Sequence, residues 1–284
     1  MKQIQSYISQ MPSLSTTVTK VVEICNSPKT SPNDLNRVIS LDPVLTGMVL
    51  RMVNSAYYAL PNKVTSLTRA IVMLGINTVK NLALSTAVLA SMGGKESFQA
   101  ISADDFWSHS ICTGIAAKYL AGVKGVQAIN REEYFVAGLL HDLGKIPINY
   151  SFPDEYSRVL GSITLDGSSP QDAEREVFGI DHCKVGKMII EKWQLGNVLK
   201  AVLYHHHNPA GADDETRNLV SIVALANKCV NILESGASME ARPDASETDE
   251  ILRAVGVDES VFSEVQDAVL NEMEKARVFL QIVK

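Results

Sequence analysis

Apolar residues recur at helical spacing along almost the whole chain, and this pattern most constrains the fold. Leu45, Val49 and Met52 are one example, because residues three and four positions apart share one face of a helix. Alternation with a period of two, which is typical of half-buried strands, is almost absent. The sequence therefore predicts an all-α protein.

Several helix ends are marked by their residues. A capping side chain stands before a proline at 31–32 and at 42–43, which is typical of a first helical turn. Gly75 is expected to close a short helix over 67–74. Further helices are predicted over 16–26, 77–92, 182–193, 219–233, 247–255 and 260–283.

The chain is expected to fall into three parts. Gly93–Gly94 follows a strongly apolar helix and is a candidate boundary between two helical subdomains. We predict an N-terminal helical subdomain over 1–95 and a helical bundle over 96–235. The rest, 236–284, is predicted to be a polar loop followed by helices that pack on the bundle.

Composition excludes several classes of protein. A net charge of −6 and a pI near 5.6 argue against a dedicated nucleic-acid binder. The sequence has neither a secretory signal nor an uninterrupted apolar run long enough to cross a membrane. We therefore expect a cytoplasmic protein with reduced thiols. The cysteines are widely scattered: Cys25, Cys112, Cys183 and Cys229.

The histidines are unevenly placed. All six lie between residues 109 and 207: His109, His141, His182, His205, His206 and His207. Imidazole is the commonest metal ligand, so this clustering suggests a metal site. Asp142 follows the apolar run V-A-G-L-L and the histidine at 141, and a carboxylate drawn into the interior needs a cation or hydrogen bonds. Asn227 shares the apolar face of its helix and should also point inward.

Simpler interpretations exist for each of these residues. A single helix histidine is usually a capping or surface residue, and histidines at the end of a helix favour its dipole without a metal. For the whole set, a shared site is the favoured interpretation. The cysteines near these elements could be soft ligands, although small core residues are the favoured interpretation.

The motifs around these residues match a known family. They read F-W-S-H-S-I-C-T, F-V-A-G-L-L-H-D-L-G-K-I, E-V-F-G-I-D-H-C-K-V-G-K-M and A-V-L-Y-H-H-H-N-P. Earlier segments match in the same order: M-P-S-L, I-S-L-D-P-V-L-T, V-N-S-A-Y-Y and A-I-V-M-L-G. Over residues 5–235 the chain resembles the HDOD branch of the HD metal-dependent phosphohydrolases. The resemblance implies a helical subdomain packed on an HD-like bundle, as a stand-alone bacterial signalling module.

The resemblance also implies a set of metal ligands. His109, His141 and Asp142 match the ligands of one ion, but Asn227 stands where the family has a late aspartate. His182, His206 and His207 match the ligands of a second ion, which shares Asp142. His205 would be a flanking residue. An amide supplies no charge, so the first site should be the weaker. The implied cofactor is Fe, Zn, Mn or Ni, as two ions, one or none.

Two functions follow from this resemblance. One is a regulatory module that acts by binding a signalling protein or a nucleotide-like ligand. The other is a phosphohydrolase acting on a nucleotide or phosphodiester, in which Asp142 would hold the metal and Lys145 would contact phosphate. The segment after His207 lacks the Gly-Tyr-Pro element of enzymes that hydrolyse cyclic di-GMP, which argues against that substrate. Tyr57 and Tyr58 could line a ligand groove, but packing between the subdomains is the favoured interpretation.

Overall fold

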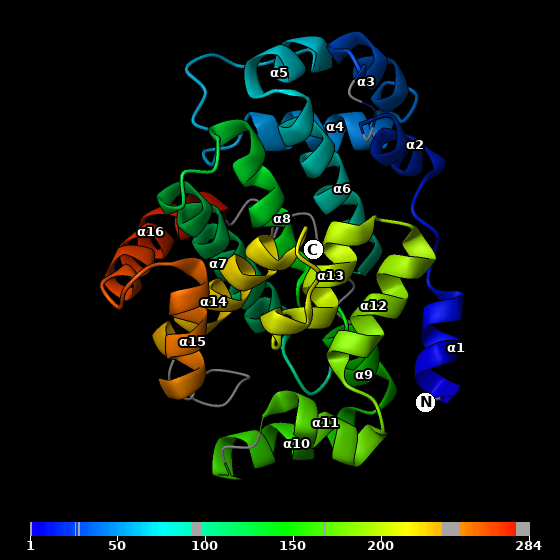
Figure 1. Cartoon of the computed structure of the whole chain (residues 1–284). Helices are drawn as coiled ribbons and strands as arrows, with labels where there is room; N and C mark the ends of the chain where they lie inside the picture. Colours follow the sequence, from blue (N-terminus) through cyan, green and yellow to red (C-terminus); the bar gives the residue numbers. More distant parts are fainter. Residues whose placement is uncertain are drawn as a thin grey trace.

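The structure is a computed structural model, and it is helical throughout its described part. It describes residues 2–25, 27, 29–92, 98–166, 169–234 and 245–276, without the side chains of 164–166 and 245–247. Helices and turns account for these residues, with no strand among them, so the predicted all-α class is confirmed (Figure 1). The predicted boundary at Gly93–Gly94 and most of the predicted loop lie outside the described residues.

The N-terminal helices precede the histidines. They are α1 (Lys2–Gln10), α2 (Thr16–Cys25), α3 (Pro32–Ile39), α4 (Pro43–Val53), α5 (Leu67–Leu74) and α6 (Ile76–Met92). Ser31 and Asp42 cap α3 and α4 as predicted, each accepting a hydrogen bond from a backbone amide in the first turn. Gly75 ends α5 with φ +86°, a conformation that favours glycine.

The remaining helices carry the histidines and the carboxyl-terminal part. They are α7 (Ala103–Val123), η2 (Ala128–Asn130), α8 (Arg131–Leu140), α9 (Lys145–Ser151), α10 (Pro153–Asp166), α11 (Pro170–Phe178), α12 (His182–Trp193), α13 (Asn197–His205), η3 (Pro209–Gly211), α14 (Arg217–Leu233), α15 (Ala245–Val255) and α16 (Val261–Ala276). Figure 1 places α2 to α6 at one end of the molecule, with α7 to α16 forming the larger part.

Helices α7 and α8 pack unusually closely, and two glycines make this possible. A Cβ on Gly138 would lie 2.7 Å from the carbonyl oxygen of Thr113 and 2.9 Å from the Cα of Gly114. A Cβ on Gly114 would lie 2.8 Å from the carbonyl oxygen of Phe135. Because real side chains do not fit at such distances, glycine at both positions lets the backbones meet. This contact fixes α7, which carries His109, against α8, which leads into His141.

The two ends of the molecule are joined by a polar cluster. Lys118 donates to Glu132 at 2.7 Å and to the Tyr57 hydroxyl at 2.9 Å, while the Tyr58 hydroxyl donates to Glu132 at 2.7 Å. The Tyr57 ring also packs against Phe135, with 5.4 Å between ring centroids. Both tyrosines therefore pack between the N-terminal helices and the bundle, as the favoured interpretation expected.

Four helices were not expected from the sequence: α1, α9, α10 and α11. Helices α10 and α11 form a hairpin between α9 and α12, at the lower edge of Figure 1. The end of α1 is held by Lys192 of α12, whose ammonium donates to the carbonyls of Ser9 at 2.9 Å and Met11 at 2.8 Å, and also to that of Ile8. Only Ile4 and Ile8 of α1 are buried, so its apolar stripe is short and easily missed.

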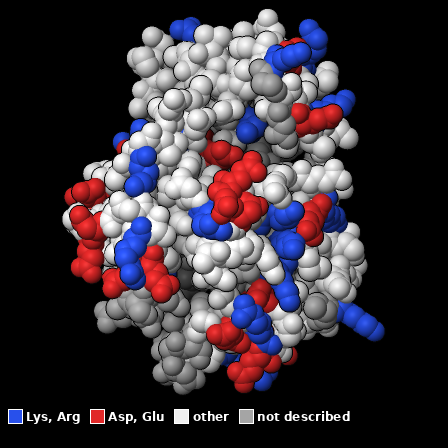
Figure 2. All heavy atoms as spheres, in the orientation of Figure 1, with Lys and Arg blue, Asp and Glu red and all other residues white. Residues whose placement is uncertain are grey.

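The lengths of the helices and the distribution of surface charge bear on whether the protein crosses a membrane or binds nucleic acid. Within the described residues, no individual helix combines the length and apolar character needed to cross a bilayer; α5 and α6 meet both criteria only as a pair bent by 118°. Acidic and basic side chains are interspersed over the face of the molecule in Figure 2.

Candidate metal centre

Asp142 stands at the centre of the histidine cluster, in the turn between α8 and α9. His141 caps the end of α8, and Gly144 precedes α9. A Cβ on Gly144 would lie 1.9 Å from the carbonyl oxygen of His182, so the turn is in direct contact with the first turn of α12. Because Gly144 has no side chain, the turn can approach α12 closely enough to place Asp142 beside His182.

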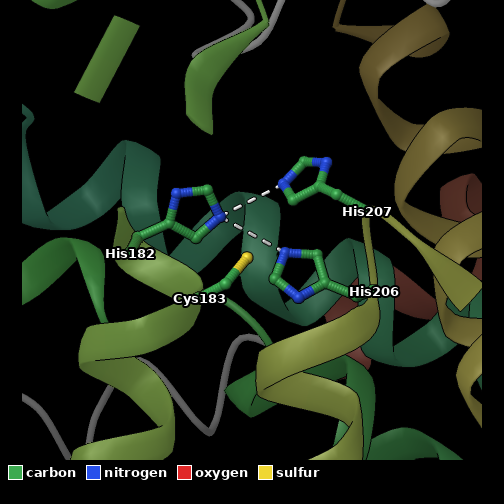
Figure 3. Close-up of side chains that lie close together, drawn as sticks. All are labelled: His182, Cys183, His206 and His207. Atoms are coloured by element: carbon green, nitrogen blue, oxygen red, sulfur yellow. Dashed lines mark hydrogen bonds between the residues drawn. The ribbon is translucent and has the colours of Figure 1, made fainter. Parts of the chain in front are cut away.

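One carboxylate oxygen of Asp142 faces two later histidines. Its Oδ1 lies 3.5 Å from Nε2 of His182 and 3.6 Å from Nε2 of His206. The same His182 nitrogen lies 3.4 Å from Nε2 of His206 and 3.1 Å from Nε2 of His207 (Figure 3). The second ligand set implied by the resemblance is thus brought together by α12, the end of α13 and the turn after α8.

The other carboxylate oxygen faces the first set and a lysine. Oδ2 of Asp142 lies 2.6 Å from Nζ of Lys145, 3.4 Å from Nε2 of His141 and 4.0 Å from Nε2 of His109. Burial alone would raise the pKa of Asp142, but the charges of His141 and Lys145 outweigh it and hold that pKa well below its usual value. Lys145 is 1% exposed, so its ammonium is part of the centre.

Two buried or half-buried carboxylates orient histidines from behind. Glu174 of α11 accepts from Nδ1 of His182 at 2.7 Å and from its backbone amide at 2.6 Å. Glu234, at the end of α14, lies 2.9 Å from Nδ1 of His109. Backbone carbonyls orient two further rings. The carbonyl oxygen of Gly138 lies 2.7 Å from Nδ1 of His141, and that of Val202 lies 3.0 Å from Nδ1 of His206. With Nδ1 engaged, each imidazole directs its Nε2 toward the centre, which is how metal-binding histidines are held.

The protonation of these rings reflects their surroundings. Burial lowers the pKa of His206 to about 4, so this ring is neutral at pH 7. Burial also opposes charge on His182, but Cys183 and Glu174 outweigh it and raise the pKa well above the ordinary value. Burial likewise opposes charge on His109, and the hydrogen bond and charge of Glu234 outweigh it, raising that pKa. Glu174 and Glu234 therefore favour positive charge on the two rings that they contact, His182 and His109.

The donor atoms fit a divalent ion. In a tetrahedral site with metal–nitrogen bonds of about 2.0–2.1 Å, neighbouring donors lie about 3.4 Å apart. The Nε2 atom of His182 lies 3.4 Å from that of His206 and 3.1 Å from that of His207, which matches that spacing. So do the distances of 3.5 and 3.6 Å from Oδ1 of Asp142 to Nε2 of His182 and of His206. Of the seven buried side-chain atoms without a hydrogen-bond partner in the described residues, three belong to this centre: Nε2 of His109, Nε2 of His141 and Oδ1 of Asp142. Buried polar atoms seldom remain without a partner, and a cation would satisfy them.

Three further candidate residues, Asn227, His205 and Cys183, lie in different surroundings. Asn227 is 2% exposed, as predicted, and its Oδ1 accepts from Nδ2 of Asn231 at 3.1 Å. His205 packs against Tyr204, with 4.7 Å between ring centroids, in keeping with a flanking role. Cys183 lies beside the later histidines: its Sγ and one ring nitrogen from each of His182, His206 and His207 all lie within 4.8 Å of one another.

Sequence reasoning missed the two orienting glutamates. Nothing in the sequence singles out Glu174 eight positions before His182, because a carboxylate in a polar helix is usually solvated. Its burial at 1% and its hydrogen bond from Tyr156, 3.1 Å long, depend on the packing of the α10–α11 hairpin.

Replacing Glu174 with glutamine should weaken Zn²⁺ binding about 10- to 100-fold, because the charge that supports His182 is lost while the side chain keeps its shape. Isothermal titration calorimetry of the metal-free protein would measure this. Tyr156→Phe is the matched control, since it removes only the outer hydrogen bond and should change affinity less. Equal Zn²⁺ affinity in Glu174→Gln and the wild type would contradict the orienting role.

Comparison with known proteins places the chain in a family. The model of the HDOD domain matches residues 11–209, which is well over half of the chain. The chain belongs to the HDOD family. The match includes helices α2 to α6 together with every histidine of the candidate metal centre.

Solved structures share this HDOD fold. An HDOD protein of unknown function from Geobacter sulfurreducens matches with a TM-score of 0.78 at 21% identity, over 98% of this chain and 97% of its own. A protein from Shewanella amazonensis SB2B, provisionally described as a phosphohydrolase, matches with a TM-score of 0.73 at 21% identity. The match covers 99% of this chain and 98% of that protein. A protein from Marinobacter aquaeolei VT8, provisionally described as a signal transduction protein, matches with a TM-score of 0.77 at 20% identity. The match covers 99% of this chain and 65% of that protein.

A curated relative is longer than this chain. An uncharacterized protein of Treponema pallidum (strain Nichols) is 25% identical over 244 residues. The match includes 84% of this chain but 46% of the relative, so the chain spans about half of that protein's length.

Proposed function

We propose that this HDOD protein is a regulatory module whose HD-type centre binds a divalent transition-metal ion, and that it acts by binding a signalling protein or a nucleotide-like ligand. The burial of the centre carries this proposal. Five of its ligands are at most 2% exposed, namely His109, His141, Asp142, His182 and His206, and His207 is half-buried. A catalytic metal site keeps an open position for substrate, whereas a structural site is closed.

Two features of the centre, a ligand substitution and an ion pair, support the same function. Asn227 brings no charge where the family has a late aspartate, which weakens the first site. Lys145 is already paired with Asp142 at 2.6 Å, so a substrate phosphate would have to compete with a buried carboxylate for its ammonium. The fold likeness to a protein described as acting in signal transduction agrees with a regulatory role.

The test combines metal content with turnover. Protein purified without chelators should contain Zn, Fe, Mn or Ni, and after metal loading should not hydrolyse a phosphodiester such as bis-(4-nitrophenyl) phosphate above the rate of the metal alone. His141→Ala is the control variant. Turnover at ordinary enzyme rates that His141→Ala abolishes would contradict the regulatory proposal and establish a phosphohydrolase.

That second candidate rests on the retained donors. His109, His141, Asp142, His182, His206 and His207 are all present, and a structural relative is described as a phosphohydrolase. When bound, a metal ion would polarise the phosphoryl group. In this chain Asp142 would hold the ion and Lys145 would bind phosphate after leaving its present partner.

A further inference from the structure

The metal centre has a sulfur donor on its three-histidine side. Cys183 is 3% exposed and follows His182 directly in α12. Its Sγ forms one cluster with ring nitrogens of His182, His206 and His207, all within 4.8 Å of one another. Figure 3 shows the sulfur directed toward the rings of His182 and His206. A thiol in this position can serve as a further ligand beside the three histidines, since zinc sites combine cysteine and histidine freely.

Charge balance favours a thiolate at this position. Three neutral imidazoles offset none of the charge of a divalent ion, and the buried ammonium of Lys145 already offsets that of Asp142. The buried carboxylate of Glu174, which accepts from Nδ1 of His182, offsets one charge of the ion. A divalent ion held only by these groups would then leave a buried excess of one positive charge, which is costly. A Cys183 thiolate would offset that charge.

The surroundings of the sulfur suit an anion. Cys183 is the second residue of α12, a helix of twelve residues whose N-terminal end carries partial positive charge. The amide of Gln171 in α11 donates to Sγ at 3.6 Å. A hydrogen bond from the outer shell tunes and orients a metal ligand, so α11 would support the sulfur as it supports His182.

We propose that Cys183 is a metal ligand, forming a sulfur-containing site with His182, His206 and His207. This inference rests on the proposed metal binding and adds its chemical selectivity. Binding replaces the S–H bond by a metal–sulfur bond and releases one proton to solvent, with no change in oxidation state. Such a site favours Zn²⁺ and Co²⁺ over Mg²⁺ and Mn²⁺, because thiolate is a soft ligand.

Cobalt absorption tests this directly. Full-length protein is reduced, freed of metal and titrated with Co²⁺, and binding is measured in parallel by calorimetry. The wild type should develop a thiolate-to-cobalt charge-transfer band in the near ultraviolet. Cys183→Ser should lose this band while keeping the visible cobalt absorption from the histidines. Cys112→Ser and Cys229→Ser, which replace buried thiols outside this cluster, should keep it.

The outcomes separate this inference from the proposed function. Cobalt that binds the wild type without a charge-transfer band, or a band that survives in Cys183→Ser, overturns the sulfur ligand and leaves metal binding intact. If calorimetry detects no cobalt binding to the wild type, both proposals fail. Cys183→Ala provides a second variant should the serine variant not fold, as judged by circular dichroism, and should lose the same band.

Discussion

Replacing Gly144 with alanine is expected to destabilise the protein by about 3 kcal/mol or more and to abolish tight metal binding. The added Cβ would lie 1.9 Å from the carbonyl oxygen of His182 and 2.6 Å from the amide nitrogen of Gly186. Both are backbone atoms in α12, so no side-chain rotation relieves the clash. The backbone angles of Gly144, φ −66° and ψ −19°, suit any residue, so the effect is steric alone.

Urea unfolding and Zn²⁺ titration calorimetry would measure both effects. Gly47→Ala in α4 is the matched control, because its added Cβ meets no atom within 4 Å. Alanine there should leave stability unchanged or raise it by up to about 1 kcal/mol, since glycine weakens a helix. A Gly144→Ala protein as stable as the wild type would show that the turn and α12 can separate at little cost.

Replacing Lys145 with methionine should destabilise the metal-free protein by about 3–5 kcal/mol, because it leaves the carboxylate of Asp142 buried without its cation. Both side chains of this pair are at most 2% exposed. The double variant Asp142→Asn/Lys145→Met should recover most of that loss, since no buried charge remains in the pair. Urea unfolding in the presence of a chelator, followed by circular dichroism, is the measurement.

A second lysine pair provides the control for burial. Lys275 and Glu272 have the same three-residue spacing and nearly the same separation, 2.7 Å, but are 43% and 37% exposed. Lys275→Met should therefore change stability by less than about 1 kcal/mol. Similar losses in the two lysine variants, or no recovery in the double variant, would mean that the Asp142–Lys145 pair does not govern the stability of this centre.

The sequence predicted those parts of the fold that depend on neighbouring residues. Ser31, Asp42 and Gly75 mark helix ends through side chains and backbone conformations that act within one turn, and each was confirmed. Helix α1 was missed because its apolar stripe is only two buried residues long. The predicted boundary at Gly93–Gly94 stays a prediction.

The centre was predictable only as a set of residue types. The histidine contexts and Asp142 could be read from the sequence, and the structure brings them together. The partners of these ligands could not be predicted, because the burial of Glu174 depends on how α11 packs and Glu234 lies 125 positions from His109. The position of Cys183 beside three ring nitrogens likewise depends on how α12 packs against α13, which local patterns do not specify.

The spread of the centre over the bundle has a thermodynamic consequence. Its ligands and their orienting groups come from α7, α8, α11, α12, α13 and α14. If the centre binds an ion as proposed, the free energy of binding adds to the free energy of folding, because these groups converge only in the folded chain. At an ion concentration a thousand times the dissociation constant, that addition is about 4 kcal/mol, a large part of what a domain usually possesses. Removal of the metal should then lower the free energy of unfolding of this protein by a similar amount.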